Sequence, residues 1–141
     1  MRDDQDSIRI CGNTSCIALG SVLSEQDRIE LILPLFLELA SDSSWRVRYT
    51  TVTQIGEICA LFPPSIVEEK LLIEFMRLMQ DVELEVRTGA ASSLSKICHF
   101  LTPEAIVNNL IKIVGNVSMD PSEHVRIGLA SDILSLYSLY F

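Results

Sequence analysis

The apolar positions of this chain recur at a fixed step. Ile32, Leu71 and Leu110 are successive members of one apolar column, so the step is 39 residues. Other columns stay apolar in the same three units without any insertion: Leu33, Leu72 and Ile111; Phe36, Phe75 and Val114; Leu39, Leu78 and Val117; Ile55, Leu94 and Ile133; Ile58, Ile97 and Leu136. A period of roughly 20–50 residues is typical of solenoid proteins. The pattern therefore predicts a linear array of similar units.

Each unit contains two helical patterns. In the first, about residues 27–40, apolar residues follow Ile32 at spacings of 1, 3 and 3, which places them on one face of a helix. The second covers about residues 45–62 and also has one apolar face. Over the whole chain we expect seven helices, at about residues 5–23, 26–40, 44–62, 64–80, 83–101, 103–118 and 121–141. Because the links are short, neighbouring helices should run antiparallel.

The prolines carry positional information. Pro64 and Pro103 align with each other and should begin the first helix of a unit, where a missing N–H costs nothing. Pro121 is expected to begin the last helix in the same way. Pro34 lies inside a helix and is expected to bend it.

A polar motif, Asp-x-x-x-x-(Val/Ile)-Arg, recurs at the same step. Its members are Asp3 with Arg9, Asp42 with Arg48, Asp81 with Arg87, and Asp120 with Arg126. The Asp falls where the first helix ends, and the Arg about one turn into the second. An arginine fork can bond a carboxylate of its own unit or of the next one, and the carboxylate can accept from free N–H groups where the second helix starts. We interpret this ladder as structural, fixing how the units stack, rather than as a binding strip.

One helix pair cannot bury its apolar face alone, so such units stack into a continuous core. The period, the two-helix unit and the Asp…Val-Arg motif resemble HEAT repeats, which implies an all-α, α–α superhelix. We expect one array over residues 1–141, divided into 3–23, 24–62, 63–101 and 102–141. It opens on a second-type helix and ends on the apolar run Leu136-Tyr-Ser-Leu-Tyr-Phe141. We therefore expect a piece of a longer protein, which self-associates through its uncapped ends.

Composition narrows the function classes. The 141 residues are 48% hydrophobic and carry a net charge of −8. Binding to phosphate backbones needs clustered Lys and Arg, so nucleic acid is not an expected partner, whereas a basic protein is. No apolar run reaches the roughly 20 residues that cross a bilayer, so no membrane association is expected. The acidic N-terminus lacks an apolar signal segment, and the four cysteines show no disulfide or zinc spacing, which favours a cytoplasmic or nuclear protein.

Catalytic chemistry has little support. His99 and His124 have no fixed relation to a Cys or Ser nucleophile, and no Gly-rich phosphate loop occurs. His124 shares its column with Arg46 and Glu85, and a column holding positive, negative and neutral groups is typical of a solvated surface. We therefore expect no catalytic residue, no cofactor and no metal site.

The turns inside the units supply the candidate binding surface. One column of these turns contains Asp6, Trp45, Leu84 and Glu123. Helices pack roughly 10 Å apart, so Trp45 and Leu84 in neighbouring turns can form one apolar patch. An exposed Trp beside Arg46 is typical of an interface hot spot. The alternative is that each side chain folds back over its own helix.

The run Asp42-Ser-Ser-Trp-Arg-Val-Arg-Tyr49, with Leu33-Pro-Leu-Phe-Leu37 and Asp81-Val-Glu-Leu-Glu-Val-Arg, resembles the HEAT-repeat scaffold (A, regulatory) subunit of protein phosphatase 2A. The resemblance implies a hook-shaped, noncatalytic scaffold whose intra-repeat turns hold a B-type regulatory subunit, with the catalytic subunit further along. Since this chain resembles middle repeats, the regulatory subunit is the expected partner and the catalytic subunit the second. The implied contact residues are Trp45 and Arg46 and, by repeat position, Leu84, Glu85, Glu123 and His124.

Two other classes stay open from the sequence. Related HEAT proteins, such as the regulatory subunit of protein phosphatase 4 or adaptors in nuclear transport and chromatin, use similar repeats, and their acidic surfaces would meet basic peptides. An enzyme with a helical fold is the third interpretation.

Overall fold

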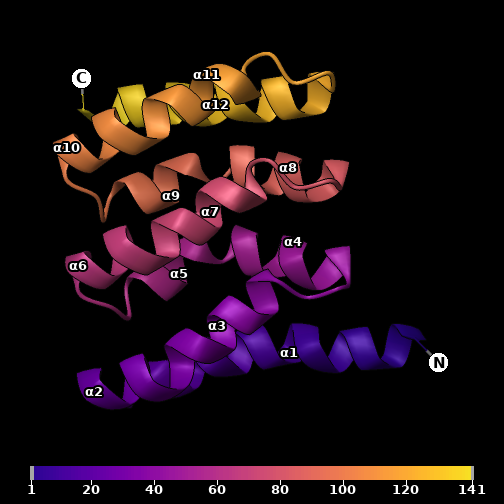
Figure 1. Ribbon diagram of the computed structural model, residues 1–141, viewed down its shortest axis with the longest axis vertical. Coiled ribbons are helices and arrows are strands. Elements are labelled where there is room, and N and C mark those ends of the chain that lie inside the picture. Colours follow the sequence, from indigo (N-terminus) through magenta and orange to yellow (C-terminus); the bar gives the residue numbers. More distant parts are fainter. Residues whose placement is uncertain (1, 141) are drawn as a thin grey trace.

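The computed structural model is a stack of α-helical hairpins that lie side by side along the long axis of the molecule (Figure 1). It describes the backbone of residues 2–140 and the side chains of residues 5–137. All regular structure in this part of the chain is helical, so the prediction of an all-α solenoid is confirmed. Helix α1 lies at one end of the stack, and α11 and α12 lie at the other.

Three hairpins follow α1 (Arg2–Gly20). Their first helices are built from α2 (Glu25–Asp27), η1 (Arg28–Ile32) and α3 (Leu33–Ala40); α6 (Pro64–Ile66), η2 (Val67–Leu71) and α7 (Leu72–Leu78); and α10 (Pro103–Ala105), η3 (Ile106–Leu110) and α11 (Ile111–Val117). Their second helices are built from α4 (Trp45–Thr53) and α5 (Ile55–Cys59); α8 (Leu84–Ala91) and α9 (Leu94–Cys98); and α12 (Glu123–Tyr140).

Each first helix passes through a π-helical turn, labelled η. The three π turns begin at Arg28, Val67 and Ile106, and so follow the 39-residue step. Pro34 comes directly after the first of them, near the start of α3. Ile73 and Lys112 occupy its position in the next two units, behind the same π turn. The irregularity therefore belongs to the repeat and is not caused by the proline.

Two of the second helices are interrupted near their middle. The helix predicted at 44–62 breaks at Gln54, and the one predicted at 83–101 breaks at Ser92 and Ser93. Side chains of the following unit bond the backbone groups near each break. The ammonium of Lys96 donates to the carbonyl of Thr53 at 2.7 Å. The carboxylate of Asp132 accepts from the amide and the hydroxyl of Ser95. Packing against the next hairpin thus makes these breaks tolerable.

The helix starts follow the sequence signals with one exception. Pro64 and Pro103 are the first residues of α6 and α10, as predicted. Ahead of α10, the side chain of Thr102 accepts from the amide of Ala105 and so caps the helix. The expected role of Pro121 is wrong, because α12 begins two residues later, at Glu123. Position 121 instead lies in the turn between the two helices of that hairpin.

The apolar columns form one continuous core between the two layers of helices. Phe36 and Phe75, equivalent residues of successive hairpins, are both fully buried. Cys59 and Cys98 share another column of this core, and burial raises the pKa of Cys59 to about 12 and of Cys98 to about 11. These thiols therefore stay protonated and act as small apolar side chains. Among the described helices, none is both long and apolar enough to cross a bilayer.

Candidate binding ridge

The arginines of the Asp–Arg ladder connect each unit to the next. Arg9 contacts Asp42, Arg48 contacts Asp81 and Arg87 contacts Asp120, each pair 33 residues apart. The Arg48 pair is bidentate, with both N···O distances 2.8 Å. The matching distances are 2.7 and 3.1 Å for Arg9, and 2.8 and 3.4 Å for Arg87. Asp3 lies outside the residues whose side chains the structure describes.

The same side chains also hold their own unit's turn together. Arg48 donates to the carbonyls of Asp42 and Ser43 at 2.8 and 3.3 Å. The carboxylate of Asp42 accepts from the amide of Ser44 at 2.7 Å, one residue before α4 begins. Arg87 with Asp81 repeats this pattern in the next unit, and Arg126 donates to the carbonyls of Asp120 and Pro121 in the last. Of the two geometries that the sequence allowed, carboxylate bonds cross to the neighbouring unit and carbonyl bonds stay within the unit.

Burial makes the central pair a charged element of the interior. The side chains of Arg48 and Asp81 are only 10% and 4% exposed. Burial acts to raise the pKa of Asp81, but hydrogen bonds from Arg48 and from the Glu83 amide outweigh it, and the net pKa lies below its usual value. The pKa of Arg48 is raised, chiefly by its bond to Asp81. Both groups are therefore ionised at neutral pH, and the pair aligns the turns of successive units.

This alignment brings the candidate contact column into a row. Trp45, Leu84 and Glu123 are the first residues of α4, α8 and α12. An open groove of about 590 Å³ runs along this row, lined by Trp45, Tyr49, Leu84, Glu85, Thr88 and His124. The groove thus combines Trp45, Leu84, Glu85 and His124 from three consecutive units, with Trp45 half-buried and Leu84 36% exposed. Of the other two candidates, Arg46 lines the neighbouring pocket described below, and Glu123 is exposed at the start of α12 without lining the groove.

Both expectations for Trp45 hold in part, because it packs against the core and also lines the groove. The groove residues that sequence reasoning missed are Tyr49 and Thr88. Each lies four residues after Trp45 or Leu84, one helical turn further along the same face. That spacing is the signal that could have found them.

Glycine makes room for the tyrosine of the groove. A Cβ atom on Gly89 would lie 2.9 Å from Cε2 of Tyr49 and 3.0 Å from its Cδ2. The ring therefore lies directly over the backbone of α8, in the interval between two second helices. Because Tyr49 is 40% exposed, the ring forms part of the groove floor and not of the core.

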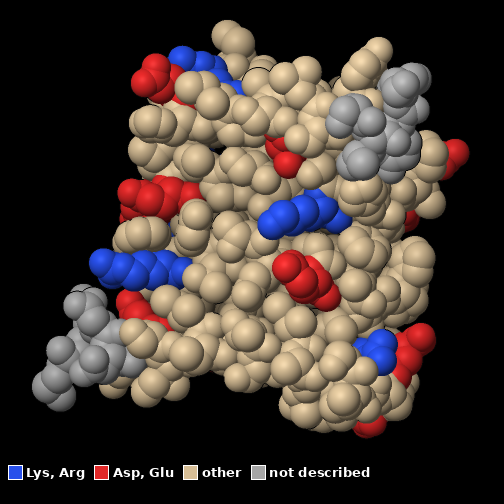
Figure 2. Space-filling view, turned by 180° about the vertical axis from the view of Figure 1, so that it is seen from behind, with Lys and Arg blue, Asp and Glu red and all other residues tan. Residues whose placement is uncertain are grey.

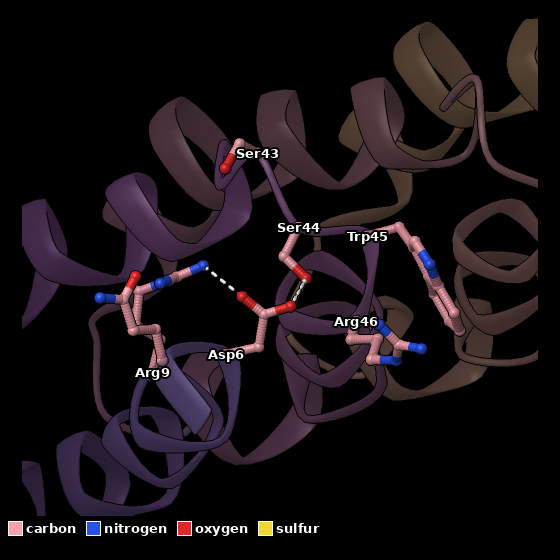
Figure 3. Close-up of a pocket in the computed structure, with 7 residues that line it drawn as sticks. Asp6, Arg9, Ser43, Ser44, Trp45 and Arg46 are labelled. Carbon is pink, nitrogen blue, oxygen red and sulfur yellow. Dashed lines mark hydrogen bonds and ion pairs between the residues drawn. The ribbon is translucent and has the colours of Figure 1, made fainter. Parts of the chain in front are cut away.

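A second, polar pocket of about 350 Å³ lies on the other side of Trp45 (Figure 3). Its centre is Asp6 of α1, which accepts from the hydroxyl of Ser44 and from Arg9, both at 2.7 Å. The Ser44 hydrogen bond, with help from Arg9 and Arg46, holds the pKa of Asp6 below its usual value. The guanidinium of Arg46 lies 5.0 Å from the centroid of the Trp45 ring, within cation–π range. Trp45 is therefore the wall between a polar pocket and an apolar groove.

Residue chemistry in the described part of the chain suits binding more than catalysis. No three His, Cys, Asp or Glu side chains there are arranged to hold a metal ion. His124 lines the groove, whereas His99 lies at a separate depression with Lys96 and Phe100. The ridge offers aromatic and aliphatic surface with charged groups at its rim, which is the composition of protein-binding sites.

Comparison with known proteins agrees with the repeat geometry. The PPP2R1A-like HEAT repeat family matches residues 64–140, more than half of the chain, and the general HEAT repeat matches residues 32–62. The PP2A protein phosphatase regulatory protein of the A type from Schizosaccharomyces pombe is 33% identical over 70 residues, which are 48% of this chain and 12% of that protein. The chain therefore spans a small part of that relative's length. Stacked 39-residue hairpins, the Asp–Arg ladder and these matches together show that the chain belongs to the PPP2R1A-like HEAT-repeat family.

Proposed function

We propose that this chain is a noncatalytic scaffold that holds a phosphatase regulatory subunit of the B type along its ridge of intra-repeat turns. The relative from S. pombe is named as a regulatory subunit of a phosphatase, which supports a scaffold role in the same kind of assembly. The catalytic subunit is the second proposed partner. In this role the hairpins supply surface and geometry, and the chemistry belongs to the bound phosphatase.

The observation that carries the proposal is the groove between Trp45 and Leu84. Large aromatic side chains that are part exposed and rimmed by polar groups dominate the affinity of protein interfaces. Arg46 stacks on Trp45 and so limits its rotamers before binding, which lowers the entropy lost on association. The ladder below keeps the two turns in register, so the groove is formed before the partner arrives.

The test is binding of the purified chain to a purified B-type regulatory subunit, measured by isothermal titration calorimetry. Truncating a hot-spot Trp costs about 2 kcal/mol or more, so Trp45→Ala should weaken binding by about 30-fold. Ile73→Ala is the matched control, because Ile73 is 56% exposed on α7 and does not line the groove. Circular dichroism verifies that both variants fold. Equal affinity for both variants, or no binding by the unaltered chain, would reject the proposal.

A HEAT adaptor of another class is the second candidate function, favoured by the acidic groups near the ridge. Glu83, Glu85 and Glu123 are all exposed, and the chain carries a net charge of −8. Such a surface attracts basic segments in general. Under this alternative, a basic transport or chromatin peptide would bind the chain more tightly than the B-type subunit does, with loss of binding on charge reversal of the glutamates and not on Trp45→Ala. The regulator of protein phosphatase 4 would instead bind subunits of that phosphatase through the groove.

Self-association is a separate proposal that rests on α12. Ile133 is 39% exposed, whereas the equivalent Ile55 and Leu94 are buried by the following hairpin. Tyr137 is 64% exposed, while Tyr140 and Phe141, expected to join it, lie outside the residues whose side chains are described. Multi-angle light scattering should show a mass that rises with concentration, and Tyr137→Ser should reduce the rise. A constant monomer mass at high concentration would count against it.

A further inference from the structure

We propose that the groove accepts its partner segment in one direction only. The segment places an apolar anchor between Trp45 and Leu84, an acidic residue at Arg46 and a basic residue at Glu85. This inference rests on the proposed binding function and specifies the chemistry of the segment that is bound.

The first argument is the position of Trp45 between two unlike cavities. One face of its surroundings is the polar pocket around Asp6, and the other is the groove with Tyr49 and Leu84. Figure 3 shows Arg46 between Asp6 and the indole of Trp45. The positive charge of Arg46 therefore lies at the α1 side of the groove. An apolar anchor that enters the groove is followed, on that side, by a cation.

The second argument is the opposite charge at the other end. Glu85 lines the groove from α8, and Glu83 and Glu123 are exposed in the same and the next turn. Figure 2 shows that basic and acidic side chains alternate along the edge of the molecule where these turns lie. The groove is thus an apolar strip with a cation at one end and anions at the other. Such a pattern is complementary to one orientation of a charged segment and repels the reverse orientation.

The third argument is the length of the strip. Hairpins pack roughly 10 Å apart, so about that distance separates the turn of Arg46 from the turn of Glu85. Two turns of an α-helix rise about 11 Å. An amphipathic helix with an acidic residue and a basic residue about seven positions apart, and an aromatic or aliphatic residue between them, fits this spacing. Each exposed ion pair contributes little alone, so the direction is read from both ends together.

The experiment uses two synthetic helical peptides of identical composition. Both carry a central Phe and Leu, lack Trp, and have blocked termini; one has Glu three to four residues before the anchor and Lys three to four after it, and the other has the two charges exchanged. Trp45 is the only tryptophan of the chain, so its fluorescence reports directly on the groove. We expect one charge order to bind about tenfold more tightly at low salt, with the ratio falling at high salt because exposed charges are screened.

Charge exchange on the protein supplies the matched control. The double variant Arg46→Glu with Glu85→Lys should reverse the peptide preference while leaving the apolar anchor site unchanged. Equal affinity of both peptides, an unchanged preference in the double variant, or no change in Trp45 fluorescence up to millimolar peptide would each overturn the inference. Retained B-type subunit binding that still depends on Trp45 would show that only the direction was wrong. Loss of subunit binding in all assays, with peptide discrimination intact, would reject the phosphatase partner and keep the groove.

Discussion

Replacing Arg48 with alanine removes the most deeply buried arginine of the ladder. Its guanidinium makes two 2.8 Å bonds to Asp81 in the next unit and two bonds to carbonyls of its own unit. Without it, a carboxylate with 4% exposure keeps the amide of Glu83 as its hydrogen-bond donor but loses its bonded cation. Removing one partner of a buried ion pair costs about 3–5 kcal/mol.

The retained amide bond at Asp81 places the expected loss at the lower end of that range, about 3 kcal/mol. For a chain of this size, each kcal/mol corresponds to about 2–4 °C in Tm. Arg48→Ala should therefore melt about 6–12 °C below the unaltered chain. Circular dichroism at 222 nm, followed through a thermal scan at pH 7, measures the shift, and urea titration gives the free energy of unfolding.

Arg126→Ala is the matched control for this variant. Arg126 donates to the carbonyls of Asp120 and Pro121 at 2.6 and 3.2 Å, and within the described residues no carboxylate lies in ion-pair range of it. Its loss should cost about 1 kcal/mol, the value of an ordinary intramolecular hydrogen bond. The difference between the two variants isolates the bond between units. If both variants melt within about 1 °C of each other, the ladder does not couple neighbouring hairpins, and the structural argument fails.

Three further outcomes follow from the same geometry. The lowered pKa of Asp81 contributes stability that is present above its unfolded pKa of about 3.9 and is lost as pH falls through the folded value, so the urea midpoint should drop below about pH 4 in the unaltered chain and less so in Asp81→Asn. Asp132→Ala removes the acceptor of the Ser95 amide, so hydrogen exchange of that amide should speed up with a loss of about 1–2 kcal/mol, whereas exchange unchanged from the unaltered chain would contradict the contact. Gly89→Ala displaces the Tyr49 ring outward, so partner binding should weaken while Tm changes little, since the ring is part exposed; unchanged affinity would show that Tyr49 does not shape the groove.

Local pattern was enough to predict the hairpins of this protein. The spacing of Ile32, Leu71 and Leu110 is a property of the chain alone, and a helix with one apolar face must bury that face against another. The same 39-residue step places Trp45 and Leu84 in neighbouring turns without reference to any tertiary contact. Residue identity at equivalent positions is information that a repeat protein carries several times, so single exceptions did not hide it.

Tertiary structure decided everything that depends on which surfaces meet. The sequence left open whether Arg48 would bond a carboxylate of its own unit or of the next, because both lie within reach of one side chain until the units are stacked. The break at Gln54 and the π turns of the first helices also arise in the assembled stack, where a following hairpin bonds the groups that a helix leaves free. Tyr49 became a groove residue for the same reason, since its surroundings come from α8, which no local pattern in α4 specifies.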